Sequence, residues 1–264
     1  MIPLDLSGLN LHFDKEKKKI ILIDENKETQ YEPLFRKLKD VRALFCGSTI
    51  TQSPETIIYS MFRGICKKKH EKTIKENKLR YDITIIEPAI FGEEYVKTAG
   101  HYHPIAKDGL SYPEVYEVIK GEGLFFLQKK EEFAGNKKLK SVFVLGKEGD
   151  LIFIPPNYGH ITINTSNEFL YMANWVSSAF ESEYKEIKER KGAIFYILQK
   201  NGGGFKLEKN DNYADYKAQP VFASPKKASF FGFEEKTPMY EFIESPEKLM
   251  FLNDPTVCPD LDYD

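Results

Sequence analysis

Paired cysteines, long apolar runs and a dominant charge are all missing from this sequence. Its three cysteines, Cys46, Cys66 and Cys258, lie far apart and form no C-x-x-C pair, so neither a disulfide framework nor a thiolate zinc site is indicated. A net charge of −2, from 38 basic and 40 acidic residues, provides no overall attraction to nucleic acid or to anionic membranes. No stretch approaches the roughly 18 apolar residues of a membrane span, and the N-terminus has no basic region followed by an apolar run. We therefore expect a cytoplasmic protein without nucleic-acid or membrane partners.

Histidine is also scarce, and three of the five histidines fall into one pattern. His101 and His103 alternate, so in a strand their rings point to the same face. Glu114 follows eleven residues after His103, and His160 opens a later β-rich run. Three imidazoles and a carboxylate suit iron(II), manganese, nickel or zinc, with coordination positions left open for a substrate.

Other carboxylates compete with Glu114 for this role, namely Glu117 and Glu122. Alternation along a strand at 115–120 places Glu114 and Tyr116 on one face and Glu117 on the other. Only one face of a strand can look into a barrel. Glu114 and Glu117 are therefore not expected to share a site.

Short β-rich runs dominate the chain from residue 79 onward. Gly, Pro and Asn separate them, which indicates an antiparallel barrel or a double-sheet sandwich and an all-β fold class. The expected strands are residues 81–86, 115–120, 123–128, 141–145, 151–154, 160–164, 169–176 and 195–198. Helical spacing of apolar residues predicts a helix over 33–44, with weaker candidates at 55–62 and 181–191.

We divide the chain into three parts. Residues 1–60 are expected to form an N-terminal extension that packs on the barrel, and residues 61–218 the barrel itself. Residues 219–264 are rich in proline and aromatic residues. That tail should wrap around the barrel, because its aromatic side chains would otherwise be exposed.

The motifs follow a recognisable order. Residues 98–103 read Thr-Ala-Gly-His-Tyr-His, residues 113–116 read Pro-Glu-Val-Tyr, and residues 155–164 read Pro-Pro-Asn-Tyr-Gly-His-Ile-Thr-Ile-Asn. Together with Lys-Gly-Glu-Gly at 120–123, this order resembles the signature motifs of the cupin superfamily. More specifically, it resembles the cupin-type glucose-6-phosphate isomerases found in archaea and some bacteria.

The resemblance covers roughly residues 79–200 and implies a cupin jelly-roll barrel with N- and C-terminal extensions that contain short helices. It implies one divalent metal ion per chain, iron(II) in the first place with Mn2+, Ni2+ or Zn2+ as alternatives. The implied metal ligands are His101, His103, Glu114 and His160. The implied substrate is a sugar phosphate, with the phosphate near Thr84, Thr98 and Gly100, although Thr84 also fits an ordinary strand residue. The resemblance further suggests a homodimer.

The implied reaction interconverts glucose 6-phosphate and fructose 6-phosphate, which moves a hydrogen between C1 and C2. Glu114 is the best candidate for a base that carries a proton through an enediol, although a metal-bound carboxylate is a weaker base than a free one. A metal-assisted hydride shift is the alternative. Tyr116 shares the face of Glu114 and is either a contact to a substrate hydroxyl or a packing residue.

Four features depart from the family pattern. The segment between His103 and Glu114 is several residues longer than usual and is expected to extend a loop near the mouth of the site. Asn157 precedes Tyr158 after the two prolines, and residues 179–182 lack a histidine. Trp175 stands where a tyrosine is expected, so a hydroxyl contact to substrate would be lost.

Two other functions fit the same ligands. A cupin dioxygenase would consume oxygen without turning over sugar phosphate. A non-catalytic metal- or sugar-binding cupin would bind metal and turn over nothing.

Overall fold

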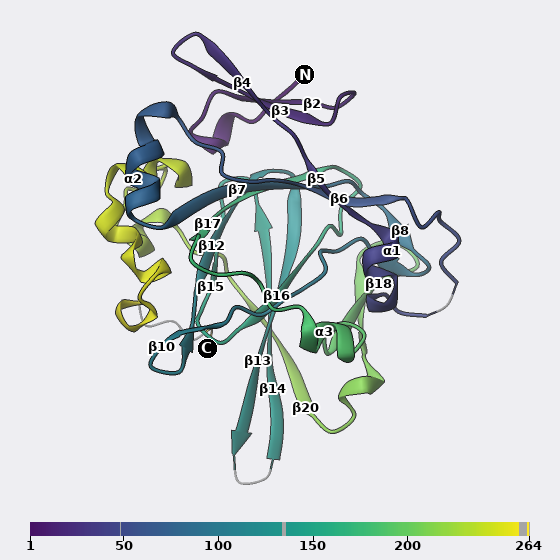
Figure 1. Ribbon diagram of the computed structural model, residues 1–264. Coiled ribbons are helices and arrows are strands. Elements are labelled where there is room, and N and C mark those ends of the chain that lie inside the picture. The colour runs from purple at the N-terminus through teal and green to yellow at the C-terminus, as the bar shows by residue number, and fades with distance from the viewer. Residues whose placement is uncertain (48, 134–135, 259–262, 264) are drawn as a thin grey trace.

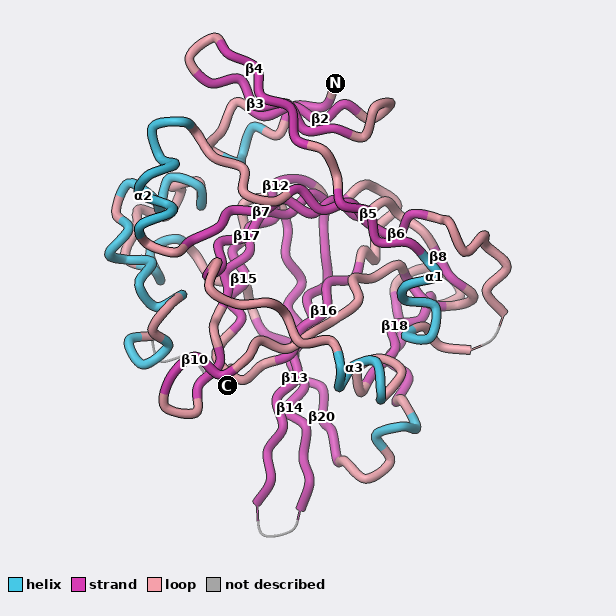
Figure 2. The backbone as a smooth tube through the Cα atoms, viewed as in Figure 1, coloured by secondary structure: helices cyan, strands magenta, loops and turns pink. Residues whose placement is uncertain are grey.

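Two facing β-sheets form the centre of the protein (Figures 1 and 2). The computed structural model describes residues 1–47, 49–133, 136–258 and 263. The first sheet has six strands in the order β15 (Leu151–Ile154), β12 (Glu114–Lys120), β17 (Leu170–Ser177), β7 (Leu79–Ile86), β6 (Ile57–Phe62) and β5 (Leu34–Lys37). The second has four, in the order β16 (Gly159–Ile163), β13 (Glu122–Phe133), β14 (Asn136–Lys147) and β20 (Lys217–Ala223). This arrangement confirms the expected all-β jelly-roll barrel.

Smaller sheets surround the barrel. The N-terminal sheet contains β1 (Ile2–Pro3), β2 (Leu11–Asp14), β3 (Lys19–Asp24) and β4 (Lys27–Tyr31). A second peripheral sheet runs β19 (Phe205–Lys209), β18 (Phe195–Gln199), β9 (Glu94–Tyr95) and β8 (Ile90–Phe91). β10 (Ile105–Lys107) and β11 (Leu110–Ser111) form a hairpin of their own.

The described helices are short. The α-helices are α1 (Leu38–Val41), α2 (Glu71–Glu76) and α3 (Lys185–Glu189). The 3-10 helices are Asp5–Ser7, Arg42–Leu44, Lys68–His70, Asp211–Tyr213, Ala228–Phe231, Met239–Glu244, Pro246–Leu252 and Pro255–Val257. None of the described helices is long and apolar enough to cross a membrane.

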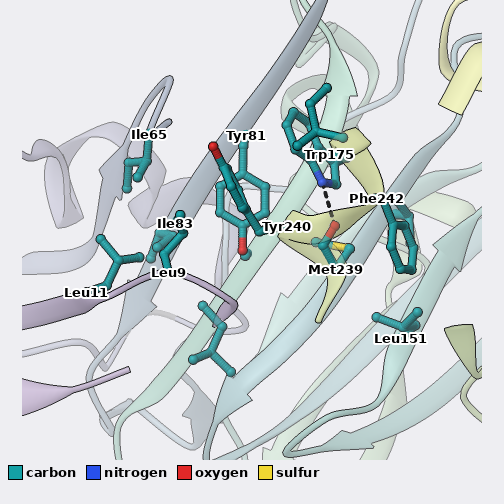
Figure 3. Close-up of a cluster of buried hydrophobic side chains, with 14 of the residues drawn as sticks. Leu9, Leu11, Ile65, Tyr81, Ile83, Leu151, Trp175, Met239, Tyr240 and Phe242 are labelled. Atoms are coloured by element: carbon teal, nitrogen blue, oxygen red, sulfur yellow. Dashed lines mark hydrogen bonds between the residues drawn. The ribbon is translucent and has the colours of Figure 1, made fainter. Parts of the chain in front are cut away.

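Alternation along the strands produces separate apolar layers. On β12, Val118 faces the inside of the barrel, where it clusters with Phe125 and Val142 of the opposite sheet. Val115 and Ile119 face outward into a second cluster, which the N-terminal sheet and the C-terminal segment cover. That outer cluster includes Trp175, whose Nε1–H donates to the carbonyl of Met239 at 2.8 Å (Figure 3). The central strands β12 and β17 of the six-stranded sheet are therefore buried on both faces.

Several expected elements differ from the structure. Residues 33–44 are not one helix, because residues 34–37 pair with β6 as an edge strand and only one turn of α-helix follows. The weak helix at 55–62 is the strand β6, whose run Ile57, Ile58 and Tyr59 suits a strand. The helix at 181–191 shortens to α3. The expected strands all appear, and two of them, β13 and β14, extend to 12 residues each.

The division into three parts stays a prediction. β6, which spans the proposed boundary at residue 60, pairs with β5 on one side and with β7 of the barrel on the other. The C-terminal 3-10 helices lie beside α2 in Figure 1, and Tyr240 of this segment accepts the backbone N–H of Lys67 at 2.8 Å. The end of the expected tail, residues 259–262 and 264, lies outside the described residues.

Candidate metal centre

The segment that carries the two alternating histidines connects the two sheets. His101 and His160 exchange backbone hydrogen bonds of 3.2 and 3.0 Å, and Thr98 N–H donates to Thr162 O at 2.9 Å. Gly100 makes this path possible, since its φ is +69° and an added Cβ would lie 2.4 Å from Ile161 Cγ1. The segment thereby holds both imidazoles against β16.

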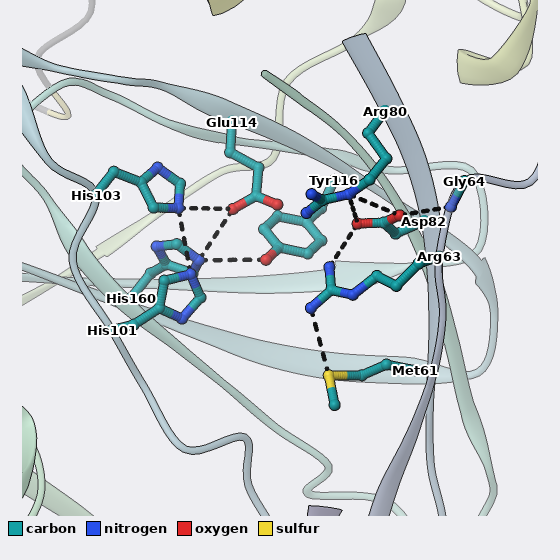
Figure 4. A network of polar contacts seen from close by, with 10 residues as sticks. All are labelled: Met61, Arg63, Gly64, Arg80, Asp82, His101, His103, Glu114, Tyr116 and His160. Carbon is teal, nitrogen blue, oxygen red and sulfur yellow. Dashed lines mark hydrogen bonds and ion pairs between the residues drawn. The ribbon is translucent and has the colours of Figure 1, made fainter. Parts of the chain in front are cut away.

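The four side chains suggested as metal ligands meet at one point inside the barrel (Figure 4). One ligand atom from each of His101, His103, Glu114 and His160 lies within 4.8 Å of the others. Glu114 Oε2 lies 3.4 Å from His103 Nε2 and 3.2 Å from His160 Nε2. His101 Nε2 is 3.2 Å from His103 Nε2. The structure thus gathers nitrogen and oxygen lone pairs from three separate parts of the sequence.

Neighbouring groups orient the ligands. His103 Nδ1 lies 2.8 Å from the carbonyl oxygen of Tyr112. A carbonyl can only accept, so Nδ1 carries the hydrogen and Nε2 keeps its lone pair toward the cluster. The hydroxyl of Tyr116 lies 3.2 Å from His160 Nε2.

Burial keeps the imidazoles of His101 and His103 neutral by lowering their pKa. It lowers the pKa of His103 to about 4, against the opposing charge of Glu114. Burial, helped by His160 and His103, also lowers the pKa of His101 well below its usual value. For Glu114, burial alone would raise the pKa, but the close contact with the His160 ring holds it below its usual value. Neutral imidazoles and an ionised carboxylate are the forms that bind metal ions.

The cluster fits a divalent cation. Glu114 Oε2 is buried and has no hydrogen-bond partner among the described residues. A buried carboxylate oxygen that faces imidazole lone pairs is unfavourable unless a cation lies between them. Three nitrogens and one oxygen match the ligand preference of Fe, Mn, Ni and Zn.

A cavity of about 420 Å³ adjoins the cluster, a size that suits a small ligand. Thr84, Thr98 and Tyr116 line it, and their contact with substrate stays a prediction. Gly100 is not among the lining residues, and its role visible here is the turn described above. The cavity is lined by Tyr59, Met61, Arg63, Arg80, Thr84, Thr98, Ala99, His101, His103, Glu114, Tyr116, Met172, Asn174, Val176, Phe180, Glu181, Ser182 and Tyr184.

Trp175 does not touch this cavity, so the inference that it replaces a substrate-contacting tyrosine is wrong. Its strand neighbours Asn174 and Val176 line the cavity, and alternation turns the indole to the opposite face. Glu117 also lies on that opposite face, where its carboxylate accepts the N–H of Met239. The expected separation of Glu114 from Glu117 is confirmed.

The long segment after His103 is held by Asn157. Asn157 Oδ1 accepts from the N–H of Ser111 at 2.9 Å, and its own N–H donates to Ser111 Oγ at 2.7 Å. Asn157 Nδ2 donates to Gly109 O at 3.2 Å. Residues 104–113 do not line the cavity, although the Tyr112 ring stacks on Phe180, which does. Two of the expected departures from the family pattern, Asn157 and the long segment, are therefore in direct contact.

Two arginines that no sequence motif indicated, Arg63 and Arg80, also line the cavity, and the buried Asp82 contacts both. Alternation along β7 could have found two of them, because Arg80 and Asp82 share a face with Thr84. Arg63 follows residues 55–62, whose pattern weakly favours a helix, so no strand alternation places its side chain on the face of Thr84.

Comparisons with known proteins identify the family. A family model described as glucose-6-phosphate isomerase (GPI) matches residues 35–214. A glucose-6-phosphate isomerase of Thermococcus onnurineus (strain NA1) is 29% identical over 173 residues, which cover 64% of this chain and 82% of that protein. One of Thermococcus kodakarensis (strain ATCC BAA-918 / JCM 12380 / KOD1) is 28% identical over 195 residues, or 71% and 93% of the two chains. A solved oxalate oxidase aligns with 42% of this chain and 47% of its own, at 19% identity and a TM-score of 0.31.

The family match spans more than half of the chain and includes both histidine-bearing segments. The chain therefore belongs to the glucose-6-phosphate isomerase family of enzymes.

Proposed function

We propose that this chain interconverts glucose 6-phosphate and fructose 6-phosphate with one divalent metal ion bound by His101, His103, Glu114 and His160. The family match supports the reaction. The observation that supports the metal is the buried Oε2 of Glu114, which faces two imidazole nitrogens without a hydrogen-bond donor among the described residues.

Iron(II) is the ion we propose first, with manganese, nickel and zinc as alternatives that the same donor set accepts. A bound ion would polarise the substrate carbonyl and stabilise negative charge that develops on the neighbouring oxygens. The ligand atoms converge beside the cavity that Tyr116 also lines, so the reacting carbons would lie there.

Protein groups then have distinct roles. Burial, and next the charge of Glu114, raises the pKa of Tyr116 well above its usual value, so its hydroxyl stays protonated and can donate to a substrate oxygen. Glu114 is the candidate to carry the proton between C1 and C2. Thr84 and Thr98 present hydroxyls to the cavity and would bind the phosphate. Gly100 would support the same subsite by shaping the backbone after Thr98.

A coupled assay of fructose 6-phosphate conversion tests the reaction. The protein is assayed as purified, after chelation, and after addition of iron, manganese, nickel or zinc. We expect chelation to abolish turnover and at least one metal to restore it. Absence of turnover under every metal contradicts the proposed function, and oxygen uptake without sugar-phosphate turnover would indicate a dioxygenase instead.

The route of the hydrogen is tested by isotope exchange. If Glu114 carries a proton through an enediol, turnover in deuterated water should place deuterium at C2. Product that retains the original hydrogen would favour the hydride shift.

A further inference from the structure

Two arginines share one buried carboxylate at the wall of the cavity. Asp82 is fully buried, and its oxygens accept from Arg63 Nη1 at 2.5 Å, from Arg80 Nε at 2.8 Å and from the N–H of Gly64 at 2.9 Å. Figure 4 shows the two guanidinium groups on either side of this carboxylate. Within the described part of the chain, Asp82 is the one carboxylate within 4 Å of either arginine.

One arginine would be enough to neutralise Asp82, so the second leaves a net positive charge. The Arg63 side chain is 38% exposed and lines the cavity. Burial opposes its charge, but Asp82 and Glu114 outweigh that effect and raise the pKa of the guanidinium. The cavity therefore contains a permanent cation with donors to spare.

The second terminal nitrogen of Arg63 lies against a cross-strand neighbour of Thr84. Arg63 Nη2 contacts Met61 Sδ at 3.5 Å, and sulfur is a weak acceptor. Met61 lies directly opposite Thr84 in the β6–β7 pair, and both side chains line the cavity. Side chains that face each other across antiparallel strands are neighbours, with Cβ atoms about 5 Å apart. Arg63 and Thr84 thus border the same small region.

Arg80, which shares Asp82 with Arg63, lies away from the metal ligands. Glu114, Val176 and Arg80 lie side by side in register on β12, β17 and β7. Strands are spaced at about 4.8 Å, so Arg80 lies roughly 10 Å across the sheet from Glu114. The phosphate on C6 is four carbons from C2. A group that binds it must therefore lie several ångströms from the metal ligands, as Arg80 does.

We propose that Arg63 binds the substrate phosphate together with the hydroxyls of Thr84 and Thr98, while Asp82 and Arg80 position its guanidinium. This inference rests on the proposed function. It makes Arg63 the residue that selects phosphorylated over neutral sugars, because it supplies a charge that the threonines lack.

The test compares Arg63→Ala, Arg63→Lys and a control variant, Arg190→Gln, which removes a positive charge bound to Asp215 outside this cavity. Two readouts are used: steady-state kinetics with fructose 6-phosphate, and calorimetric binding of inorganic phosphate to the metal-loaded protein. Metal content and melting temperature are measured for each variant. For Arg63→Ala we expect KM and the phosphate Kd to rise about 10- to 100-fold, the loss typical of a charge-assisted hydrogen bond, with kcat within about threefold. Arg63→Lys should have intermediate values of KM and phosphate Kd, and Arg190→Gln should have the values of the starting protein.

A KM and phosphate Kd within twofold of the starting protein, in folded and metal-loaded Arg63→Ala, would overturn the inference. A fall in kcat alone would also overturn it, because Arg63 would then act at the reacting carbons. If Arg63→Ala does not fold, the double variant Arg63→Gln with Asp82→Asn removes both charges and is judged by the same criteria. If the starting protein lacks isomerase activity but Arg63→Ala still weakens phosphate binding, the proposed function fails and the anion site stands.

Discussion

At the scale of single residues, the cavity depends on which face of a strand each side chain occupies. Glu114 and Tyr116 point into the barrel beside the histidines, whereas Glu117 points away into the outer apolar cluster. The pKa values of the two glutamates are consequently shifted in opposite directions. Contacts with the histidines keep the pKa of Glu114 below its usual value, and burial raises the pKa of Glu117 to about 8.

Removal of the Tyr116 hydroxyl is the most specific test at the scale of single residues. Tyr116→Phe removes an O–H that lies 3.2 Å from His160 Nε2 and faces the cavity. We expect kcat for fructose 6-phosphate to fall by about tenfold or more, because a proton donor near the substrate oxygen is lost, while metal content is kept. Steady-state kinetics and metal analysis provide the measurement.

Tyr171→Phe is the matched control. The Tyr171 side chain lies in the outer cluster, and its hydroxyl has no hydrogen-bond partner among the described residues. Its removal should leave kcat unchanged. A Tyr116→Phe enzyme with kcat within twofold of the starting protein would show that Tyr116 only packs.

At the scale of elements, the outer face of β12 binds the C-terminal segment. The Glu117 carboxylate accepts from Met239 N–H, and the carbonyl of Met239 accepts from Trp175. Because the pKa of Glu117 is about 8 in the fold against an ordinary value of 4.5, the folded chain keeps a proton that the unfolded chain releases between these pH values. Its contribution to stability therefore decreases as pH rises from about 5 to 8.

Glu117→Gln should remove this dependence, since the amide oxygen still accepts from Met239 without ionising. At pH 9 we expect the variant to be more stable than the starting protein, by on the order of a few kcal/mol, and at pH 5 to be within about 1 kcal/mol of it. Denaturant unfolding of both proteins at the two pH values measures the difference. A difference that does not change with pH would mean that Glu117 ionises freely in the fold.

Much of the barrel could be predicted at this scale, because period-2 alternation and turn residues mark strands locally. The eight expected strands and the grouping of the two alternating histidines follow from such local signals, whereas β20, which pairs in parallel with β14, was not among them. β5 and β6 could not be predicted in this way, because apolar residues at helical spacing compete there with pairing to β7, which is a tertiary contact. The position of Arg63 next to Thr84 depends on the register of that same pair, and a single sequence does not encode it in any local pattern.

At the scale of the whole molecule, the two faces of the six-stranded sheet have different roles. The inner face carries the cavity, and the outer face binds the N-terminal sheet and the C-terminal segment (Figures 1 and 3). Changes on the outer face should therefore affect stability more than turnover. The expected homodimer and cytoplasmic location stay predictions.

The central claim is that one metal ion, bound by three histidines and Glu114, is required for isomerase turnover. The most direct measurement is a titration of the chelated protein with iron(II), with bound metal and fructose 6-phosphate turnover recorded together for the starting protein and for His160→Ala. We predict that turnover rises with bound metal to a plateau at one ion per chain. His160→Ala should gain neither bound metal nor turnover. Full turnover in the chelated protein, or turnover in His160→Ala without bound metal, would contradict the account.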